Sequence, residues 1–313
     1  MGKASSEIRT CQPSAMEEKY GNRRHIINFL IKSHSMKPPK HNPQANQNYH
    51  DRVAPLYDGI YQGARWELWY ELSWEGMKRW LPRDLSAPIL DLGCGTGRYG
   101  LKLAKSGYKV TLSDLSHGML EATRKKVLEI GVEERVSLIQ ADVMDLKEFE
   151  KHHYALAIAQ GDVLSFAAHA PKALKEIRRV LRPGGVLVAS VDQTYAALQH
   201  YCEKEDLDGL EALVQRSEME WLAHDPQERF PVHTFTKEEL RATLEKCGFE
   251  VLDIFGKTVL PLKKLEHLLG DPTVYRRVME LEKKLCRKIS ALGMAGHLQF
   301  AAKVQGELED DSK

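Results

Sequence analysis

The stretch "ILDLGCGTGRYG", residues 89–100, joins a short apolar run to a helix-like segment through a glycine-rich turn. Its glycines follow the pattern GxGxG and are Gly93, Gly95 and Gly97. A turn of this kind exposes backbone N–H groups at a helix N-terminus, where anionic groups bind. The dinucleotide fingerprint GxGxxG is incomplete, because Arg98 occupies the place of its third glycine.

Carboxylates next to this turn limit the class of ligand that it can bind. Asp91, two residues before the first glycine, would repel a pyrophosphate and attract an ammonium or sulfonium. Asp114 ends the next strand, where a carboxylate accepts both hydroxyls of a ribose. We expect Met119 to lie against an adenine face, Asp142 to accept from the adenine amino group and Val143 to offer a backbone N–H. The pattern predicts a positively charged, phosphate-free adenosine compound, and S-adenosylmethionine fits it.

Apolar strands and amphipathic helices alternate over much of the chain, which predicts a doubly wound sheet. We expect strands within residues 88–93, 108–114, 135–142, 154–162, 186–191, 249–259 and 295–305. Thr236 is expected to cap the helix before the sixth strand. Residues 57–81 have the spacing of a helix with an aromatic stripe of Trp66, Trp69 and Tyr70. This stripe is expected in the core or along a ligand cleft.

From about Tyr49 to Lys303 the chain resembles the class I S-adenosylmethionine-dependent methyltransferases. The resemblance rests on "LDLGCGTGRYGLKLAKSGYKVTLSDLSHGMLE", "ADVMDL" and "ALKEIRRVLRPGGVLVASV". "YHDRVAPLYDGIY" resembles the first helix of the branch with the ubiquinone/menaquinone-biosynthesis and many small-molecule methyltransferases. The resemblance implies an α/β, Rossmann-like seven-stranded sheet, mostly parallel with an antiparallel last strand, and helices on both faces.

The resemblance also implies an enzyme that moves a methyl group from S-adenosylmethionine to a nucleophilic atom of a small-molecule acceptor. The transfer is an in-line displacement that leaves S-adenosylhomocysteine and requires no metal, so its main demand is positioning. The expected cofactor-binding residues are Tyr49, Tyr57, Arg65, Asp91, Gly93, Cys94, Gly95, Gly97, Asp114, Leu115, Met119, Asp142, Val143 and Gln160.

Three residues are candidates for the acceptor side. Gln160 and Asp162 follow the fourth strand, whose carboxyl end is the natural place to face the transferred methyl group. An alternative role for Asp162 is to cap the following turn. His233, in "PVHTF", is expected to reach the cleft from a substrate cover.

Composition, charge and the extent of the resemblance divide the chain into several segments. Residues 1–48 form a flexible extension with eight Lys/Arg and three Asp/Glu, and residues 49–305 form the methyltransferase domain. Within that domain, residues 195–235 are the expected substrate cover and residues 260–294 a helical insertion. An acidic tail covers residues 306–313.

Composition excludes several classes of protein. The net charge of +1 gives no general attraction to nucleic acid or to acidic membranes. No apolar run approaches the ~20 residues of a membrane span, and the first residues have no apolar core of a secretion signal. Five scattered cysteines argue against disulfides and structural zinc. We therefore expect a cytoplasmic protein with free thiols and no membrane partner.

Three alternatives stay open at this point. A nicotinamide-dependent oxidoreductase conflicts with Asp91 and Arg98. A tRNA-modifying methyltransferase acting on a carboxylate or base of a modified nucleoside is the second reading. Bacterial carboxymethoxyuridine-tRNA methyltransferases have a similar helical insertion, and "FGKTVLPL" loosely resembles their sequence. A non-catalytic protein that keeps the cofactor is the third.

Overall fold

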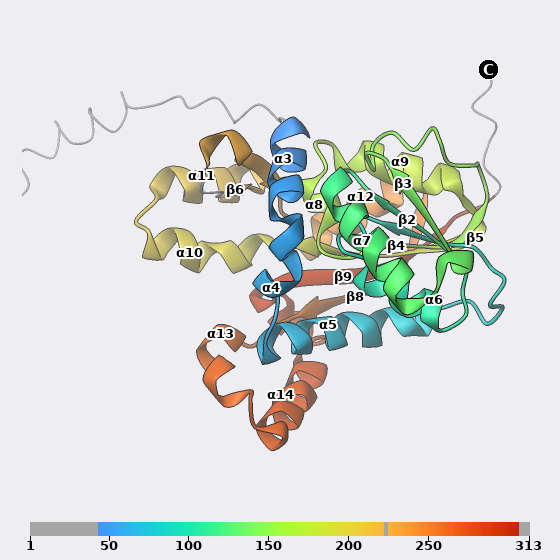
Figure 1. The fold of residues 1–313 in the computed structure, drawn as a ribbon. Helices are drawn as coiled ribbons and strands as arrows, with labels where there is room; N and C mark the ends of the chain where they lie inside the picture. Colours follow the sequence, from blue (N-terminus) through green and yellow to red (C-terminus); the bar gives the residue numbers. More distant parts are fainter. Residues whose placement is uncertain (1–42, 222–224, 307–313) are drawn as a thin grey trace, which may run out of the picture. The chain divides into compact units, whose positions relative to one another are not determined.

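A seven-stranded sheet forms the centre of the protein in a computed structural model, which describes residues 43–221 and 225–306. The strand order is β3-β2-β1-β4-β5-β9-β8 (Figure 1). The strands are β1 Ile89–Leu92, β2 Val110–Asp114, β3 Val136–Gln140, β4 Tyr154–Ala159, β5 Leu181–Asp192, β8 Phe249–Lys257 and β9 His297–Val304. β9 is antiparallel to both β5 and β8, whereas the other pairs are parallel. The predicted fold class is confirmed.

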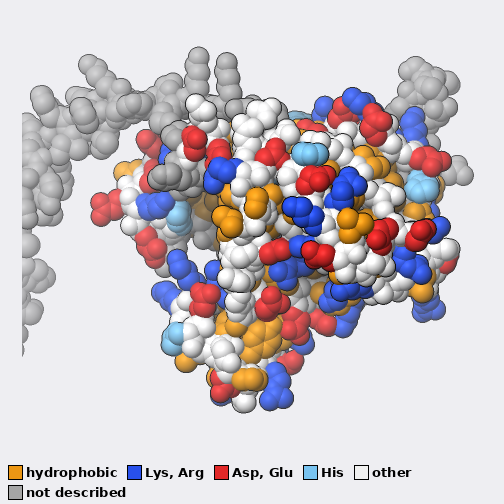
Figure 2. Space-filling view, viewed as in Figure 1, with side chains coloured by type: hydrophobic (Ala, Val, Ile, Leu, Met, Phe, Trp, Pro, Cys, Tyr) orange, Lys and Arg blue, Asp and Glu red, His pale blue; other side chains and the backbone are white. Residues whose placement is uncertain are grey.

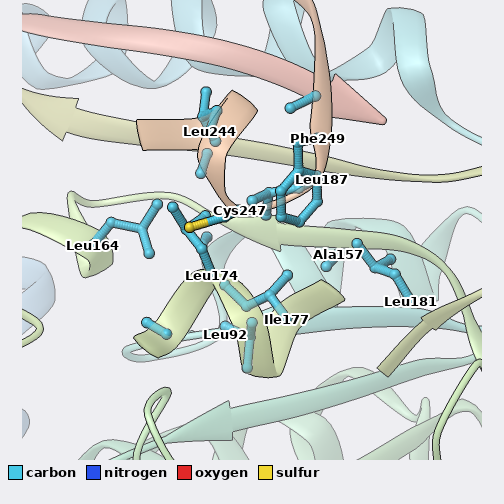
Figure 3. Packing of buried hydrophobic residues seen from close by; sticks show 14 of the residues in the cluster. Leu92, Ala157, Leu164, Leu174, Ile177, Leu181, Leu187, Leu244, Cys247 and Phe249 are labelled. Carbon is cyan, nitrogen blue, oxygen red and sulfur yellow. The ribbon is translucent and has the colours of Figure 1, made fainter. Parts of the chain in front are cut away.

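Helices cover both faces of this sheet, because every central strand is apolar on both sides. One face packs against α5 Ala64–Met77, α6 Arg98–Lys105 and α7 His117–Ile130. The other packs against α8 Val163–Phe166, α9 Ala170–Val180 and α12 Lys237–Lys246. Figure 3 shows the second core, where Leu174 and Ile177 of α9 and Leu244 of α12 meet the strand residues Leu187 and Phe249. The Thr236 hydroxyl accepts from the Glu239 N–H, as the sequence predicts for a helix cap.

Further helices and strands lie outside the sheet and the helices that cover it. They are α3 Pro43–Val53, η1 Ala54–Leu56, α4 Tyr57–Ile60, η2 Lys78–Trp80, η3 Glu133–Arg135, η4 Thr194–Ala197, α10 Leu198–Glu203, α11 Leu207–Arg216, β6 Glu218–Trp221, η5 Pro226–Glu228 and β7 Phe230–His233. β6 and β7 pair as a separate antiparallel hairpin, which the sequence analysis did not predict. The remaining helices, α13 Leu262–Leu265, η6 Glu266–Leu268, α14 Pro272–Leu285 and η7 Ile289–Met294, form the insertion, and α14 packs against α5.

The boundary expected at residue 48 lies inside a helix, because α3 already begins at Pro43. The rest of the basic extension, Cys11 and the acidic tail lie outside the described residues. Cys94, Cys202, Cys247 and Cys286 are free thiols. None of the helices in the described part of the chain combines the length and apolar character needed to cross a bilayer.

Candidate active site

The glycine turn after β1 is held open by its own backbone and by Asp114. Gly93, Gly95 and Gly97 have φ angles of 59°, 55° and 85°, a region that favours glycine. A side chain at Gly93 would also collide with Val163, since an added Cβ would lie 2.4 Å from its Cγ2. Asp114 accepts from the Gly95 N–H at 2.8 Å and, through its other oxygen, from the Ser116 N–H at 2.9 Å. The turn therefore keeps its N–H groups and one carboxylate at the same edge of the sheet.

Asp91 is the second carboxylate of this turn, and it is almost completely buried. It accepts from the Gly100 N–H of α6 at 2.9 Å. Burial raises the Asp91 pKa to about 8, because the only opposing contribution is this hydrogen bond and Asp114 adds further repulsion. A buried carboxylate of this kind favours a ligand that brings a positive charge.

A first cavity of about 110 Å³ opens beside Asp114 at the carboxyl ends of β1, β2 and β3. Its lining includes eight of the predicted cofactor residues: Tyr57, Gly93, Gly95, Asp114, Leu115, Asp142, Val143 and Gln160. His50 of α3, which the sequence analysis did not select, lines it as well. These residues meet because parallel strands present their carboxyl ends at one edge of the sheet.

A second cavity of about 210 Å³ adjoins the first and contains Asp91 and Cys94 in its wall. Its other walls are rich in aromatic rings: His50, Tyr57, Tyr61, Trp66, Trp69, Tyr70, Tyr99, Phe166 and Trp221. The rings contact one another, with 4.7 Å between the Tyr57 and Tyr61 centroids and 5.3 Å between those of Trp69 and Tyr70. The aromatic stripe predicted on α5 thus serves both the core and a cavity.

Several buried polar atoms of the residues that line this second cavity have no hydrogen-bond partner within residues 43–221 and 225–306. They include Gln160 Oε1, Trp69 Nε1, Tyr99 Oη and Asp162 Oδ1. Buried polar groups in folded proteins normally have a partner, either protein or solvent or ligand. The second cavity is therefore suited to a molecule that has polar atoms as well as an apolar body.

Charged residues form a row across three strands at one end of the second cavity. Asp192 ends β5, His297 begins β9 and Lys257 ends β8, and the strand register pairs His297 with each of the other two. Directly paired residues project to the same face of a sheet, so the three side chains are neighbours. Asp162, after β4, completes the group, with its Oδ2 at 3.0 Å from His297 Nδ1. We call these four residues the charged cluster.

Lys257 is the most deeply buried member of the charged cluster, with no exposed surface. Its ammonium donates to the Ser73 hydroxyl at 3.0 Å and lies 3.8 Å from the centroid of the Trp69 ring. Burial lowers the Lys257 pKa to about 8, although Asp162 and Asp192 oppose this shift. The aromatic face and the two carboxylates therefore supply the stabilisation that water would otherwise give.

The two aspartates of the charged cluster have different pKa values. Burial would raise the pKa of Asp162, but His297 and Lys257 outweigh burial and lower it to about 2. Burial and the nearby Asp162 raise the pKa of Asp192 to about 7. Burial would lower the pKa of His297, but Asp162 and Asp192 raise it above its usual value. Both shifts favour the charged forms of Asp162 and His297, whose side chains lie close enough for an ion pair.

Asp162, Asp192 and His297 each offer a ligand atom, and these atoms lie within 4.8 Å of one another. Such a set of oxygen and nitrogen donors can bind a divalent cation. The Lys257 ammonium already supplies positive charge beside both carboxylates. We therefore treat the charged cluster as a set of charged side chains that balance one another and do not assign a metal to it.

Asp162 is the N-terminal cap residue of α8, with φ 66°, but its side chain makes no capping hydrogen bond. The carboxylate contacts His297 instead, so the predicted alternative of a helix cap describes only its backbone. Gln160 and Asp162 both line the second cavity, where the sequence analysis expected the acceptor.

The structure places five other predicted residues outside the linings of both cavities. Met119 is fully buried and packs against Val53 and Ala54. His233 lies on β7 with its Nε2 at 2.9 Å from the Glu239 carboxylate. Neither side chain lines a cavity in this structure, since the methionine packs against apolar residues and the histidine contacts a glutamate, so their contact with a ligand stays a prediction.

The other three residues outside the linings have packing roles. Tyr49 packs against Trp221 with ring centroids 5.5 Å apart, and its neighbour His50 takes the place at the cavities. Arg65 lies over the Trp66 ring at 4.4 Å and pairs with a glutamate. Gly97 caps α6, where an added Cβ would lie 2.9 Å from side chains of the core.

Cationic side chains near the second cavity are paired with acidic ones. Arg98 lies 3.6 Å from the Tyr70 ring centroid and 3.6 Å from a carboxylate oxygen of Glu67. Lys126 pairs with Asp58 at 2.5 Å. On the face shown in Figure 2, Lys and Arg side chains are interspersed with Asp and Glu. This face has no uniform positive field for a phosphate backbone.

Methyltransferases are among the proteins that resemble this chain. A family model described as a methyltransferase domain matches residues 89–185. The tRNA 5-carboxymethoxyuridine methyltransferase of Escherichia coli (strain K12) is 24% identical over 264 residues, which cover 82% of this chain and 96% of that protein. The demethylmenaquinone methyltransferase of Symbiobacterium thermophilum is 32% identical over 154 residues, 47% of this chain and 59% of that protein. The solved structure of Haemonchus contortus phosphoethanolamine N-methyltransferase 2, with phosphomonomethylethanolamine and S-adenosylhomocysteine, has a TM-score of 0.56 at 18% identity, over 85% of this chain and 60% of that one.

Proposed function

The chain is a class I S-adenosylmethionine-dependent methyltransferase, and on that premise we propose that its acceptor is a small molecule with a flat, apolar body. The acceptor binds in the second cavity, between the aromatic rings and the charged cluster. The observation that carries this proposal is the aromatic lining of a cavity that adjoins the glycine turn. Aromatic walls contribute large apolar contact areas and favour stacked or edge-on rings.

Bound S-adenosylmethionine supplies a methyl group on a sulfonium, which becomes a neutral thioether when the methyl group leaves. We assign its adenosine end to the first cavity, where Asp114 and Asp142 are available for the ribose and the adenine. Asp91 is in the wall of the second cavity, so the amino-acid end of the cofactor would reach into that cavity, where the carboxylate favours the ammonium. The residues shared by both cavities are His50, Tyr57, Gly93, Gly95, Gln160, Gly161 and Phe166, so the methyl group would lie at their junction.

One feature favours a small molecule over RNA. The cations Arg98 and Lys126 near the second cavity are ion-paired, which leaves them poorly placed to bind phosphates. A modified tRNA nucleoside is nevertheless a second candidate, because the similarity to the E. coli tRNA methyltransferase spans nearly the whole of that protein.

Transfer of a labelled methyl group distinguishes these two acceptors. The protein is incubated with methyl-labelled S-adenosylmethionine and an extract of the cells that produce it, separated into a small-molecule fraction and an RNA fraction. We expect label in a small compound, which mass spectrometry then identifies. Label that appears in RNA, disappears with ribonuclease and falls steeply with added salt would contradict the proposal and support the second candidate.

Two variants control this experiment. Asp114→Ala removes the carboxylate that organises the first cavity and should abolish labelling together with S-adenosylhomocysteine binding. Trp66→Leu removes one aromatic wall and should raise the KM for the acceptor about tenfold, with the affinity for S-adenosylhomocysteine unchanged. If Trp66→Leu leaves the acceptor KM unchanged, the acceptor does not lie against this wall.

A further inference from the structure

We propose that Asp192 takes a proton from the acceptor, so that the acceptor's nucleophile is an O–H or N–H group. His297 and Lys257 act as positioning residues that hold this carboxylate at the wall of the second cavity. The inference rests on the proposed function and adds to it the chemical class of the acceptor. It follows from the charged cluster, which the methyl donor does not require.

The strand register explains how the carboxylate is held. β9 lies between β5 and β8, and His297 is paired with Asp192 on one side and Lys257 on the other. All three residues are at the edge of the sheet where both cavities open. A carboxylate fixed from strands on a rigid sheet keeps its position better than one on a mobile loop.

Asp192 is the aspartate with capacity left for a proton. His297 Nδ1 is 3.0 Å from Asp162 but 3.7 Å from Asp192. The Asp162 side chain is 9% exposed, whereas that of Asp192 is 23% exposed and lines the second cavity. Asp162 is thus occupied by the ion pair with His297, and Asp192 faces the space in which an acceptor would lie.

The titratable groups that face Asp192 give it properties suited to a proton acceptor near neutral pH. They are Asp162 after β4, His297 on β9, Lys257 on β8 and the phenol of Tyr61 after α4. Burial and Asp162 raise the Asp192 pKa to about 7, while the two cations limit the rise. A general base is most effective when its pKa lies near the working pH.

The step balances without another reactant. The acceptor's O–H or N–H nucleophile attacks the methyl carbon, so an O–C or N–C bond forms. The C–S bond breaks and its electron pair stays on sulfur. The proton of the O–H or N–H group moves to Asp192 and then to solvent, and nothing is oxidised or reduced.

A matched pair of probes tests this inference. 2-Naphthol and 2-naphthalenethiol have the same flat body, but the aromatic thiol ionises far more readily and needs no base. Methylation of each by S-adenosylmethionine is followed by mass spectrometry in the wild type and in Asp192→Asn. We expect the variant to lose about a hundredfold or more of the kcat/KM for 2-naphthol, whereas the value for 2-naphthalenethiol changes little.

The pH dependence of kcat/KM distinguishes a positioning role of Lys257 from a merely structural one. In the wild type, kcat/KM for 2-naphthol should rise with pH through the ionisation of Asp192 near 7. Lys257→Met removes a neighbouring positive charge, so it should shift this rise to higher pH while S-adenosylhomocysteine still binds. Asp208→Asn, an exposed aspartate of α11, serves as the matched control and should leave both probes unaffected.

Several results would overturn the inference. They are an equal loss for both probes in Asp192→Asn, methylation of the thiol alone by the wild type, or transfer to neither probe. Activity that requires added Mg²⁺ and disappears with a chelator would assign the charged cluster to a metal instead. Transfer to RNA and to neither probe would be the failure of the proposed function itself, which keeps the two failures distinguishable.

Discussion

We expect Asp91 to couple the binding of the methyl donor to pH. Its carboxyl group has a pKa of about 8 in the free protein because it is buried, so it is mostly protonated near pH 6. A ligand ammonium stabilises only the ionised form, and binding must therefore release a proton. We expect the affinity for S-adenosylhomocysteine, measured by calorimetry, to rise by up to about tenfold per pH unit between about pH 6 and 8.

Two comparisons isolate the contribution of Asp91. Adenosine lacks the amino-acid end, so its affinity should not rise over the same pH range. The Asp91→Asn side chain cannot ionise, so the affinity of this variant for S-adenosylhomocysteine should not rise with pH. Calorimetry in buffers of different ionisation enthalpy should also show no proton release on binding. A slope for adenosine as steep as that for the full ligand would refute this role.

Much of the lining of the first cavity could be predicted residue by residue, because its positions follow directly from the ends of consecutive parallel strands. Asp114, Asp142 and Gln160 were found in this way, and all three line the first cavity. His50 and Trp221 were missed, because their places depend on how α3 and the β6–β7 hairpin fold over the sheet. No local spacing in the sequence specifies that arrangement.

The direction of the strand β9 explains why the sequence analysis did not select His297. Functional residues of an α/β sheet are sought after the strands, since parallel strands present their carboxyl ends to the ligand. β9 runs antiparallel, so its first residue, His297, lies at that edge. The antiparallel last strand was predicted, and its first residue was therefore open to the same reasoning. Lys257, at the end of β8, could have been found by the usual rule.

The carboxylate of Asp51 links helix α3 to the N-terminus of α7. Asp51 accepts from the Ser116 hydroxyl at 2.5 Å and from the Gly118 N–H at 2.8 Å, at the N-terminus of α7. α3 also carries His50, which lines both cavities. Asp51→Ala removes hydrogen bonds to a charged group, each worth about 1.5–3 kcal/mol, and should lower the affinity for S-adenosylhomocysteine about tenfold or more.

Hydrogen exchange shows whether this loss comes from α3. In Asp51→Ala, the amides of residues 43–53 should exchange faster than in the wild type, while those of β1 and β4 remain unchanged. Glu121→Ala removes an exposed ion pair with Arg124 on α7 and should affect neither exchange nor affinity. Weak binding with normal exchange in α3 would show that Asp51 acts on the ligand and not on the helix.

For the domain as a whole, the site is a source of instability that the two cores must offset. Burying carboxylates and a lysine at one edge of the sheet opposes folding, whereas the apolar clusters on both faces favour it. Ligand binding restores part of the stability that the buried charges cost, because the ligand binds only the folded state. Function and stability are therefore linked through the same few ionisable groups.

This linkage predicts how the stability of the ligand-free protein depends on pH. Asp91 and Asp192 have folded pKa values of about 8 and 7, above their unfolded values, so between about pH 5 and 8 the unfolded state binds fewer protons. The raised pKa of His297 acts in the same direction, since its stabilisation is lost as pH rises. The free energy of unfolding, measured with urea, should thus fall from about pH 5.5 to about pH 8 by on the order of 1–3 kcal/mol. Asp91→Asn and Asp192→Asn should each flatten the fall, and a wild-type stability that rises over this range would contradict the raised pKa values.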